Sequence, residues 1–556
     1  MTDKTAGYKW LRLSFWCAAI SLGASEAWAT RFAMNPDGIS YLDIGDAYWR
    51  RDWHNALNAY WSPLYSWILG FFLKVLKPSP YWEFPVAHLV NFLIYLAALA
   101  CFEFFLLSVV AYQQSREAED INEPYDVLPE WAWLVLGYTL FISCSISLIT
   151  LSLVTPDMCV AALVYLTSGL LLRIRSGVGT RATFALLGLV LGVAYYAKSV
   201  MFVLAFPFLV ISLFFRSGVR KGVADVLLAT AIFFAVASPL IVALSVAKHR
   251  LTFGDSGAVN YEIFVDGVDV FLPEGSGQLH PARKISGFAT IHEFAYPISG
   301  TYPLWYDTSY WHDGIKPSFN PKGQIKTIER SIVADLWLVV GVHFSFTLAL
   351  LALVLIAPRP SRFLGRSARS WPITIPALSA LVLYGLVYTE YRYIAAFVLL
   401  LWLAAFSGIS LPASQGSRRL IGIAVTGIAA VTLFLSGRTV CHDLIDPLNS
   451  VSVPWEVASK LDELGIKPGD KLAVVAAEPF GSGGAFAARL ARAQIVAQVD
   501  TPDVFWKGTA TSRARLIGTI STTGVKAVLG SGGLPAPPDS DWSKVGDTSF
   551  YVLLLQ

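Results

Sequence analysis

A long series of hydrophobic segments constrains this chain more than any other feature of its sequence. A helix needs roughly 20 apolar residues to cross about 30 Å of hydrocarbon. Only 15% of the 556 residues are charged, whereas soluble domains carry about 25%. The sequence therefore predicts a polytopic α-helical membrane protein with about eleven transmembrane helices, at about 8–29, 84–111, 131–151, 155–172, 182–197, 199–215, 222–247, 332–357, 373–389, 393–411 and 420–436.

Two hydrophobic segments near the N-terminus differ from the other predicted spans. The first span ends in Ala27-Trp28-Ala29, a pattern typical of signal-peptidase sites, so it is either cleaved or retained. The segment from Pro63 to Leu76 has 14 residues and as a helix would reach only about 21 Å. We expect it to form an interfacial or re-entrant helix rather than a span.

The distribution of basic residues sets the predicted orientation. Lysines and arginines gather before the first span and in the loops 173–181, 216–221, 359–369 and 418–419, which alternation puts on one side. Loops rich in Lys and Arg face the cytoplasm. We therefore expect a protein of the bacterial inner membrane, with a cytoplasmic N-terminus and with residues 30–62, 248–331 and the C-terminal portion on the periplasmic side.

The polar segments divide the chain into two expected domains. Residues 1–437 form the transmembrane domain, which includes a first periplasmic loop at 30–80 and a long one at 248–331. Residues 438–556 alternate amphipathic and short apolar runs, a pattern that predicts a small periplasmic α/β domain. The run from Gly481 to Gly484 is either a tight strand-to-helix turn or a phosphate cradle at a helix N-terminus.

Four aspartates and many aromatic residues lie in the first periplasmic loop, between Thr30 and Ser62. Carboxylates near hydrocarbon are costly and are therefore usually functional. Asp37 is a candidate catalytic base, although it could equally be a helix N-cap. Asp43 and Asp46 either lie on a solvated helix face or ligate a divalent cation, which prefers carboxylate oxygens.

Cationic side chains occur in the other external segments and could surround the same cavity. Lys198 and Arg392 lie between spans, and His280 and Arg283 lie in the long loop. Breaking a glycosyl–phosphate bond leaves charge on the phosphate, which fixed Arg and Lys donors stabilise. A carboxylate can remove the acceptor proton. Alternatively, Lys198 could extend to the membrane interface, and Arg392 could do so while paired with Glu390.

The sequence resembles the GT-C superfamily of polyprenyl-phosphate-dependent glycosyltransferases, over roughly residues 8–436. It is most similar to the branch of bacterial protein O-mannosyltransferases, lipid A aminoarabinose transferase and RgtA/B/C/D-like enzymes. The resemblance rests on four short elements and on their order: Asp37-Gly38-Ile39-Ser40-Tyr41, the Trp61–Tyr65 stretch, Thr155-Pro156-Asp157 and Glu390-Tyr391-Arg392-Tyr393.

The resemblance implies an inverting single displacement at the periplasmic face, with Asp37 as the base that activates the acceptor. The expected partners are a polyprenyl-phosphate sugar and a glycan, lipid or protein acceptor. Many relatives carry two adjacent acidic residues where this chain has Asp37 and Gly38, a departure that argues against a second catalytic carboxylate and against a metal. No cofactor is therefore implied with certainty, and a divalent cation is the one that stays open. The expected phosphate-binding residues are Lys198, Arg392, Tyr391, Arg283 and His280, and the expected substrate-binding residues are Tyr41, Trp61, Asp157 and Glu390.

Two functions of other classes remain open from the sequence. A flippase for a lipid-linked sugar would need alternating access, and transporters often contain internal repeats and polar residues at mid-membrane depth. The polar residues here gather at one face instead, which favours an enzyme. The C-terminal portion could also bind a partner, as in a receptor or assembly protein.

Overall fold

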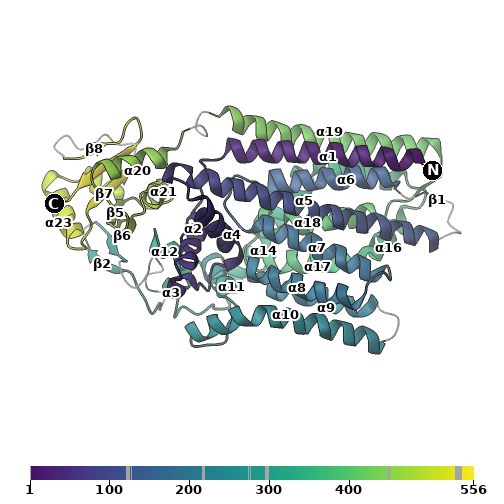
Figure 1. Cartoon of the computed structure of the whole chain (residues 1–556), viewed down its shortest axis with the longest axis horizontal. Coiled ribbons are helices and arrows are strands. Elements are labelled where there is room, and N and C mark those ends of the chain that lie inside the picture. The colour runs from purple at the N-terminus through teal and green to yellow at the C-terminus, as the bar shows by residue number, and fades with distance from the viewer. Residues whose placement is uncertain are drawn as a thin grey trace.

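The structure is a computed structural model that describes residues 2–119, 125–126, 128–215, 219–272, 275, 277–287, 289–294, 300–412, 414–446, 451–531 and 541–555. Parallel helices form a bundle, and a sheet lies beyond one end of it (Figure 1). The helices of the bundle are α1 (Thr2–Ala29), α5 (Pro80–Glu119), α6 (Glu130–Ile142), η1 (Ser143–Ile149), α7 (Asp157–Arg175), α8 (Arg181–Ala197), α9 (Val200–Ser212), η2 (Leu213–Phe215), α10 (Val219–Ala247), α14 (Pro321–Trp337), η4 (Leu338–Val342), α15 (Phe344–Ile356), α17 (Trp371–Gly385), α18 (Tyr391–Phe406) and α19 (Gln415–Ile445).

Each of the eleven predicted spans coincides with helical structure. By length and composition, five helices among the described residues could cross a membrane, namely α5, α6 with η1, α7, α10 and α19. The count is up to six if the bent pair of α14 with η4 and α15 is one span. Shorter apolar helices occupy 181–197, 200–215 and 391–406. The prediction of a polytopic α-helical protein is confirmed at this level.

One predicted span differs from the structure. The segment 332–357 was expected to be a single straight helix, but the chain bends by 77° between Pro321–Val342 and Phe344–Ile356. His343 lies at the bend and is buried. Its Nδ1 accepts a hydrogen bond from Trp402 Nε1 at 3.0 Å, and its Nε2 lies 3.3 Å from Ser143 Oγ. These partners on α18 and η1 stabilise the break, and hydrophobicity alone could not indicate it.

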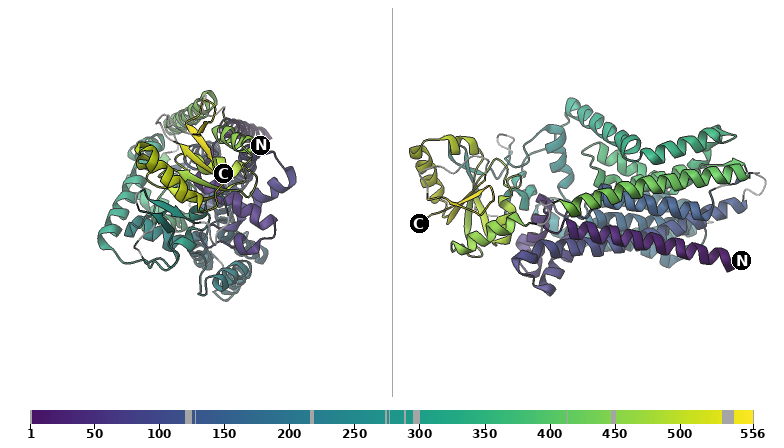
Figure 2. Two further views of the ribbon diagram at one scale, coloured as in Figure 1. Left: turned by 90° about the vertical axis from the view of Figure 1, so that its left-hand side faces the viewer. Right: turned by 90° about the horizontal axis from the view of Figure 1, so that it is seen from above.

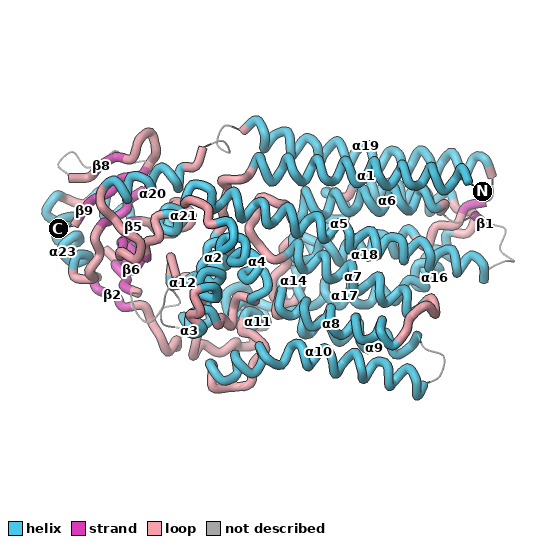
Figure 3. The backbone as a smooth tube through the Cα atoms, in the orientation of Figure 1, coloured by secondary structure: helices cyan, strands magenta, loops and turns pink. Residues whose placement is uncertain are grey.

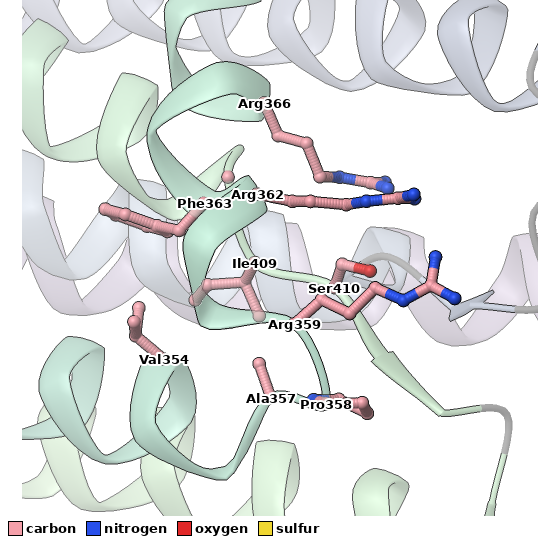
Figure 4. A pocket seen from close by; sticks show the side chains of 10 residues that line it. Val354, Ala357, Pro358, Arg359, Arg362, Phe363, Arg366, Ile409 and Ser410 are labelled. Atoms are coloured by element: carbon pink, nitrogen blue, oxygen red, sulfur yellow. The ribbon is translucent and has the colours of Figure 1, made fainter.

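The predicted basic loops gather at the end of the bundle where the N-terminus lies (Figures 1 and 3). A close view of this end shows Arg359, Arg362 and Arg366 extending in the same direction beside a shallow pocket (Figure 4). The short helices η5 (Pro360–Arg362), α16 (Phe363–Ser367) and η6 (Ala368–Ser370) carry them. Residues 216–218 of another basic loop lie outside the described residues. This arrangement agrees with the predicted alternation of loops.

The opposite end of the bundle carries the polar segments. Pro36 and Pro63 each begin a helix at its first turn, where the missing N–H costs nothing. The helix at Pro63–Leu76 has the predicted bounds and ends at Lys77, whose φ of 45° turns the chain. The elements here are α2 (Pro36–Trp49), α3 (Trp53–Ala56), α4 (Pro63–Leu76), α11 (Ser256–Tyr261), η3 (Glu262–Asp266), α12 (Pro303–Tyr306) and α13 (Thr308–Trp311).

A seven-stranded sheet lies beyond these segments and confirms that the C-terminal portion contains a small sheet (Figure 2). The strand order is β2-β3-β6-β5-β7-β9-β8, with β5 parallel to both β6 and β7. The strands are β2 (Arg283–Ser286), β3 (Ile291–Glu293), β5 (Lys471–Val475), β6 (Gln494–Val499), β7 (Ala527–Ser531), β8 (Ser543–Lys544) and β9 (Phe550–Leu554). The helices of this region are α20 (Val453–Glu463), α21 (Gly484–Leu490), α22 (Pro502–Lys507) and α23 (Ala510–Ser521), and a separate pair of strands, β1 (Tyr125–Asp126) and β4 (Leu411–Pro412), lies at the basic end.

Two of these strands come from the long loop and not from the C-terminal portion. β3 pairs antiparallel with β6, and β2 pairs with β3. The segment 248–331 was expected to be a long loop, and its two strands provide one edge of the sheet. The sheet therefore joins residues on both sides of the expected domain boundary at 437/438.

A buried cluster of charges fixes the C-terminal portion to the bundle end. The guanidinium of Arg489 on α21 contacts three carboxylates, with N–O distances of 2.6 Å to Asp43, 2.7 Å to Asp46 and 2.6 Å to Glu83. Arg492 contacts Asp46 at 3.0 Å and also pairs with Glu83. The Arg489 side chain is 4% exposed and that of Glu83 is fully buried. Because these charges are paired and removed from water together, the loss of any one side chain would leave its partners buried without a compensating charge.

We expect Arg489→Ala to destabilise the protein by about 3–5 kcal/mol, since removing one partner of a buried pair leaves uncompensated charge. The measurement is the thermal unfolding of purified protein in detergent. Arg515→Ala removes an exposed arginine from α23 of the same region and serves as the control. An unfolding temperature of Arg489→Ala equal to that of the control would contradict a stabilising role.

Candidate active site

Asp37 lies at the start of α2 but does not cap it. The N-cap residue is Asn35 and Pro36 follows it. The side-chain oxygen of Asn35 accepts a hydrogen bond from the backbone N–H of Val154 at 2.8 Å, so it joins α2 to the turn before α7. The Asp37 carboxylate instead faces Arg392, whose Nη2 is 3.1 Å away. The interpretation of Asp37 as a helix N-cap was therefore wrong.

Arg392 contacts three carboxylates from distant parts of the sequence. Its guanidinium lies 3.1 Å from Asp37, 3.5 Å from Asp157 and 2.5 Å from Glu390. These residues belong to α2, α7 and the turn before α18, and the Arg392 side chain is only 13% exposed. The alternative of an ion pair with Glu390 alone at the membrane interface therefore does not describe its surroundings.

Lys198 lies beside this arginine, in the turn between α8 and α9. Its ammonium is 2.8 Å from Asp157 and lies 3.3 Å from the centre of the Tyr393 ring. The Tyr384 ring is farther, at 5.9 Å. An ammonium over an aromatic face is stabilised by the ring quadrupole. Asp157 thus contacts both cations, and it fixes Lys198 and Arg392 at neighbouring positions.

The site contains more carboxylates than cations. Asp37, Asp157 and Glu390 face Arg392 and Lys198, so the cluster is anionic when all of its members are charged. Burial raises the pKa of the Asp37 carboxyl, and Arg392 opposes that shift only in part. Burial likewise lowers the pKa of the Lys198 ammonium, with Asp157 opposing the shift. A carboxyl with a raised pKa is a stronger base than an exposed aspartate.

A large cavity opens beside the cations. Its volume is about 790 Å³, and its walls are formed mainly by apolar and aromatic side chains. Lys198, Tyr384 and Tyr393 line it on one side, and Phe202 and Ile241 of the bundle line it on another. The cavity therefore combines two cations at its wall, Lys198 and Arg250, with a largely apolar interior, as a ligand with a charged group and an apolar chain would require.

Aromatic residues of the first loop form the wall opposite the bundle. The Tyr41 ring meets the Trp61 ring edge-on at 5.1 Å, and both residues line the cavity. Trp61 Nε1 and Ser40 Oγ both donate to the carbonyl of Trp305, at 2.9 and 2.8 Å. The long loop thus positions Trp61 directly and Tyr41 through its neighbour Ser40, which are two of the four residues predicted to bind substrate.

Gly38 follows Asp37 at a position where no side chain fits. A Cβ built there would be 2.5 Å from Met34 Sδ and 2.8 Å from Val154 Cβ. The hydrogen bond from the Val154 backbone N–H to the Asn35 side-chain oxygen holds Val154 in place. The absence of a second acidic residue beside Asp37 therefore has a steric reason in this chain.

Three of the predicted phosphate-binding residues direct their side chains to other partners. Arg283 is on β2, where its side chain is 78% exposed and pairs with Glu293 at 3.2 Å. The His280 ring stacks on Tyr310 at 4.1 Å. Tyr391, the chain neighbour of Arg392, begins α18 and packs, half-buried, against the hydrophobic core. Within the described contacts, no side chain of the three pairs with the charged groups of Asp37, Arg392 or Lys198.

The carboxylates that were considered as metal ligands have other partners. Asp43 is buried against Arg489 and also accepts hydrogen bonds from the backbone N–H and the hydroxyl of Thr301, at 2.7 and 3.0 Å. Asp46 pairs with both Arg489 and Arg492. Among the described residues, no three His, Cys, Asp or Glu side chains are grouped so that they could hold a metal ion.

The sequence interpretation missed two features of the site. The first is the pair of rings beside the Lys198 ammonium, Tyr384 and Tyr393. The second is the role of Glu83, Arg489 and Arg492, which hold α2 from the side opposite the cavity. Arg489 and Arg492 are three residues apart, a spacing that would put both on one face of a helix. Nothing in the sequence indicated that this face meets the carboxylates of Asp43, Asp46 and Glu83.

The helical bundle, the polar end segments and the sheet beyond them together form a fold that several solved structures share. The structure is similar to ArnT from Cupriavidus metallidurans in the apo state, with a TM-score of 0.53 and 13% identity over 98% of both chains. It is also similar to the same protein bound to undecaprenyl phosphate, with a TM-score of 0.54 and 14% identity over 97% of both chains. The predicted resemblance is confirmed at the level of the fold.

A third similar structure is the apo oligosaccharyltransferase of Archaeoglobus fulgidus, with a TM-score of 0.51 and 12% identity over 94% of this chain and 69% of that one. No protein-family model and no curated protein sequence matches the chain. The similarity to these structures therefore concerns the fold alone.

We expect Gly38→Asp, which would create two adjacent carboxylates, to destabilise the protein by about 1–3 kcal/mol, because an added side chain must displace Val154 or Met34. Thermal unfolding is the measurement. The control is Gly257→Asp on α11, where a Cβ meets nothing within 4 Å. Equal unfolding temperatures for the two variants would show that position 38 has room for a side chain.

Proposed function

We propose that this protein is an integral membrane glycosyltransferase that transfers a sugar from a polyprenyl-phosphate-linked donor to a glycan, lipid or protein acceptor. The observation that carries the proposal is the cluster of Asp37, Arg392, Asp157 and Lys198 beside the aromatic cavity. In this proposal the chain lies in the bacterial inner membrane and the cluster faces the periplasm. The fold of the ArnT structure that holds undecaprenyl phosphate supports the same class of donor.

The donor enters with its polyprenyl chain along the apolar part of the cavity and its phosphate toward Lys198 and Arg392. Charge-assisted hydrogen bonds from both cations stabilise the negative charge that grows on the phosphate as the glycosyl bond breaks. The aromatic rings of Tyr41 and Trp61 provide flat surfaces on which a sugar can stack. Tyr391, Arg283 and His280 take no part in this arrangement of the donor.

Transfer proceeds by a single inverting displacement. The acceptor oxygen attacks the anomeric carbon, the bond from that carbon to the phosphate oxygen breaks, and polyprenyl phosphate leaves with the bonding electrons. Asp37 accepts the acceptor proton as the new glycosidic bond forms. No redox partner is required, and the charges balance between the protonated Asp37 and the phosphate that leaves.

The contact between Arg392 and Asp37 gives Arg392 a second role. Asp37 is bound to Arg392 at 3.1 Å, and a carboxylate held by a guanidinium is a weaker base than one released from it. A donor phosphate competes with Asp37 for the same guanidinium. Donor binding therefore frees the base and raises its proton affinity before the acceptor reacts.

Asp37→Asn should abolish transfer while leaving the fold intact, because the amide cannot accept the proton. The measurement is lipid analysis of membranes from cells with the wild type, without the protein, and with Asp37→Asn. We expect one polyprenyl-phosphate sugar to accumulate in both defective strains, and its mass identifies the sugar. Asp503→Asn, at an exposed carboxylate of the C-terminal portion, is the control.

A different result of the same analysis would support a flippase. If the total pool stays constant and the sugar lipid is trapped in the cytoplasmic leaflet, the protein moves the lipid and Asp37 is not a base. Normal transfer by Asp37→Asn would also remove the carboxylate from the mechanism.

The pH dependence of transfer tests the coupling of Arg392 to Asp37. The base works only when it is ionised, so the rate falls as the pH decreases through the pKa of Asp37, which burial has raised. Arg392→Gln removes the nearest cation. The pH at which the rate falls on the acidic side of the profile, its acidic limb, should therefore increase by about 1–3 pH units. Arg392→Lys keeps a cation and should move it less. The measurement is kcat/KM against pH, and an unmoved limb in Arg392→Gln would exclude Asp37 as the titrating group.

A further inference from the structure

A second cavity lies on the outer side of α2, away from the cavity that Lys198 lines. Its volume is about 270 Å³, and it is formed by the end of α2, the end of α4 and the end of α21. Four cationic side chains line it: Arg50, Lys74, Lys77 and Arg492. Three separate segments of the chain thus bring positive charge to one hollow.

The protein neutralises only part of the positive charge of this hollow. The one carboxylate in its lining is Asp46, which pairs with Arg489 and Arg492 and also interacts with Arg50, and Glu83 pairs with Arg492. Within the described residues, no carboxylate lies within 4 Å of the charged groups of Arg50, Lys74 or Lys77. The hollow therefore keeps an excess of positive charge for a ligand from outside the chain.

All four cations lie at helix C-terminal ends, where the helix dipole favours positive charge. Lys74 and Lys77 lie at the end of α4, Arg50 is the C-cap residue of α2, and Arg492 comes directly after the C-cap of α21. The dipoles favour each cation singly, whereas the fold brings three helix ends to one cavity. A phosphate group is the ligand that converging Arg and Lys side chains bind together.

The surroundings of the hollow indicate the source of that phosphate. On α4, next to Lys74, three large apolar side chains are exposed to solvent: Phe71 at 45%, Val75 at 59% and Leu76 at 49%. Trp49, which also lines the hollow, is 42% exposed. Exposed apolar residues beside lysines are typical of a helix that lies in the headgroup layer of a bilayer, and tryptophan is enriched at that depth.

We propose that this hollow binds the phosphate of an anionic phospholipid, whose acyl chains lie along the exposed apolar face of α4. The site is separate from the donor cavity and does not depend on the transfer reaction. Because Arg492 also belongs to the charge cluster that holds the C-terminal portion, the bound lipid stabilises that docked arrangement by mass action.

The test compares two double variants of the purified full-length protein. Lys74→Gln/Lys77→Gln removes two cations from the hollow. Lys322→Gln/Lys326→Gln removes two exposed lysines from α14 and is the matched control. Binding of phosphatidylglycerol is measured by native mass spectrometry from detergent, with phosphatidylcholine as the uncharged reference lipid.

We expect the wild type and the control to bind phosphatidylglycerol equally, and the hollow variant to bind it at least tenfold more weakly, since each basic residue near an anionic headgroup contributes appreciably to binding. Phosphatidylglycerol should also raise the unfolding temperature of the wild type but not that of the hollow variant. Equal unfolding temperatures of all three proteins in phosphatidylcholine show that folding is intact. If the double variant unfolds early, Arg50→Gln replaces it.

Three results would overturn the proposal. Unchanged phosphatidylglycerol binding by the hollow variant means that the cations do not form the site. An equal loss in the Lys322→Gln/Lys326→Gln control means that only general surface charge attracts the lipid. Displacement of phosphatidylglycerol by millimolar glycerol 1-phosphate means that the hollow takes a free phosphate ester rather than a membrane lipid.

Discussion

The site depends above all on one buried guanidinium. Arg392 lies between carboxylates from α2, α7 and the turn before α18, and without it three negative charges would be left close together with only Lys198 to oppose them. Removing a guanidinium from so enclosed a position costs several kcal/mol. The same cluster includes Lys198, which lines the cavity, and it holds the Asp37 carboxylate at 3.1 Å from Arg392. The interaction that holds these helices together therefore also positions the proposed base.

α2 is held from two sides by arginines, and this fixes the direction of its first turn. Arg392 contacts Asp37 at the beginning of the helix, and Arg489 contacts Asp43 and Asp46 further along it. Thr301 adds two hydrogen bonds to Asp43 from the long loop. The first loop, the long loop and the C-terminal portion therefore form one rigid layer over the bundle end. A catalytic group on such a support keeps its geometry better than one on a free loop.

Hydrophobic periodicity and length predicted the helices of the bundle and the bounds of α4 well, because those depend on local composition. The bend at His343 was not predicted, since it depends on partners on α18 and η1 that lie far away in the sequence. The chemical type of the residues and the order of the short sequence elements identified Asp37, Lys198 and Arg392. The structure brings these three together with Asp157. Arg283 and His280 have other partners in the structure, Glu293 and Tyr310, which charge type and membership of the long loop do not reveal. The burial of Asp43 and Asp46 required knowledge of Arg489, which is more than 400 residues away.

The sheet that combines β2 and β3 of the long loop with strands of the C-terminal portion imposes an order on biosynthesis. β3 pairs with β6, which is translated about 200 residues later. Until that strand emerges and crosses to the same side, the hairpin of β2 and β3 has an unpaired edge, and unpaired edges promote association with other chains. Contacts over such sequence separations also form slowly. A chain that stops after α19 would keep all of the helices that carry the proposed catalytic cluster, and yet it would display this edge permanently to its neighbours in the membrane.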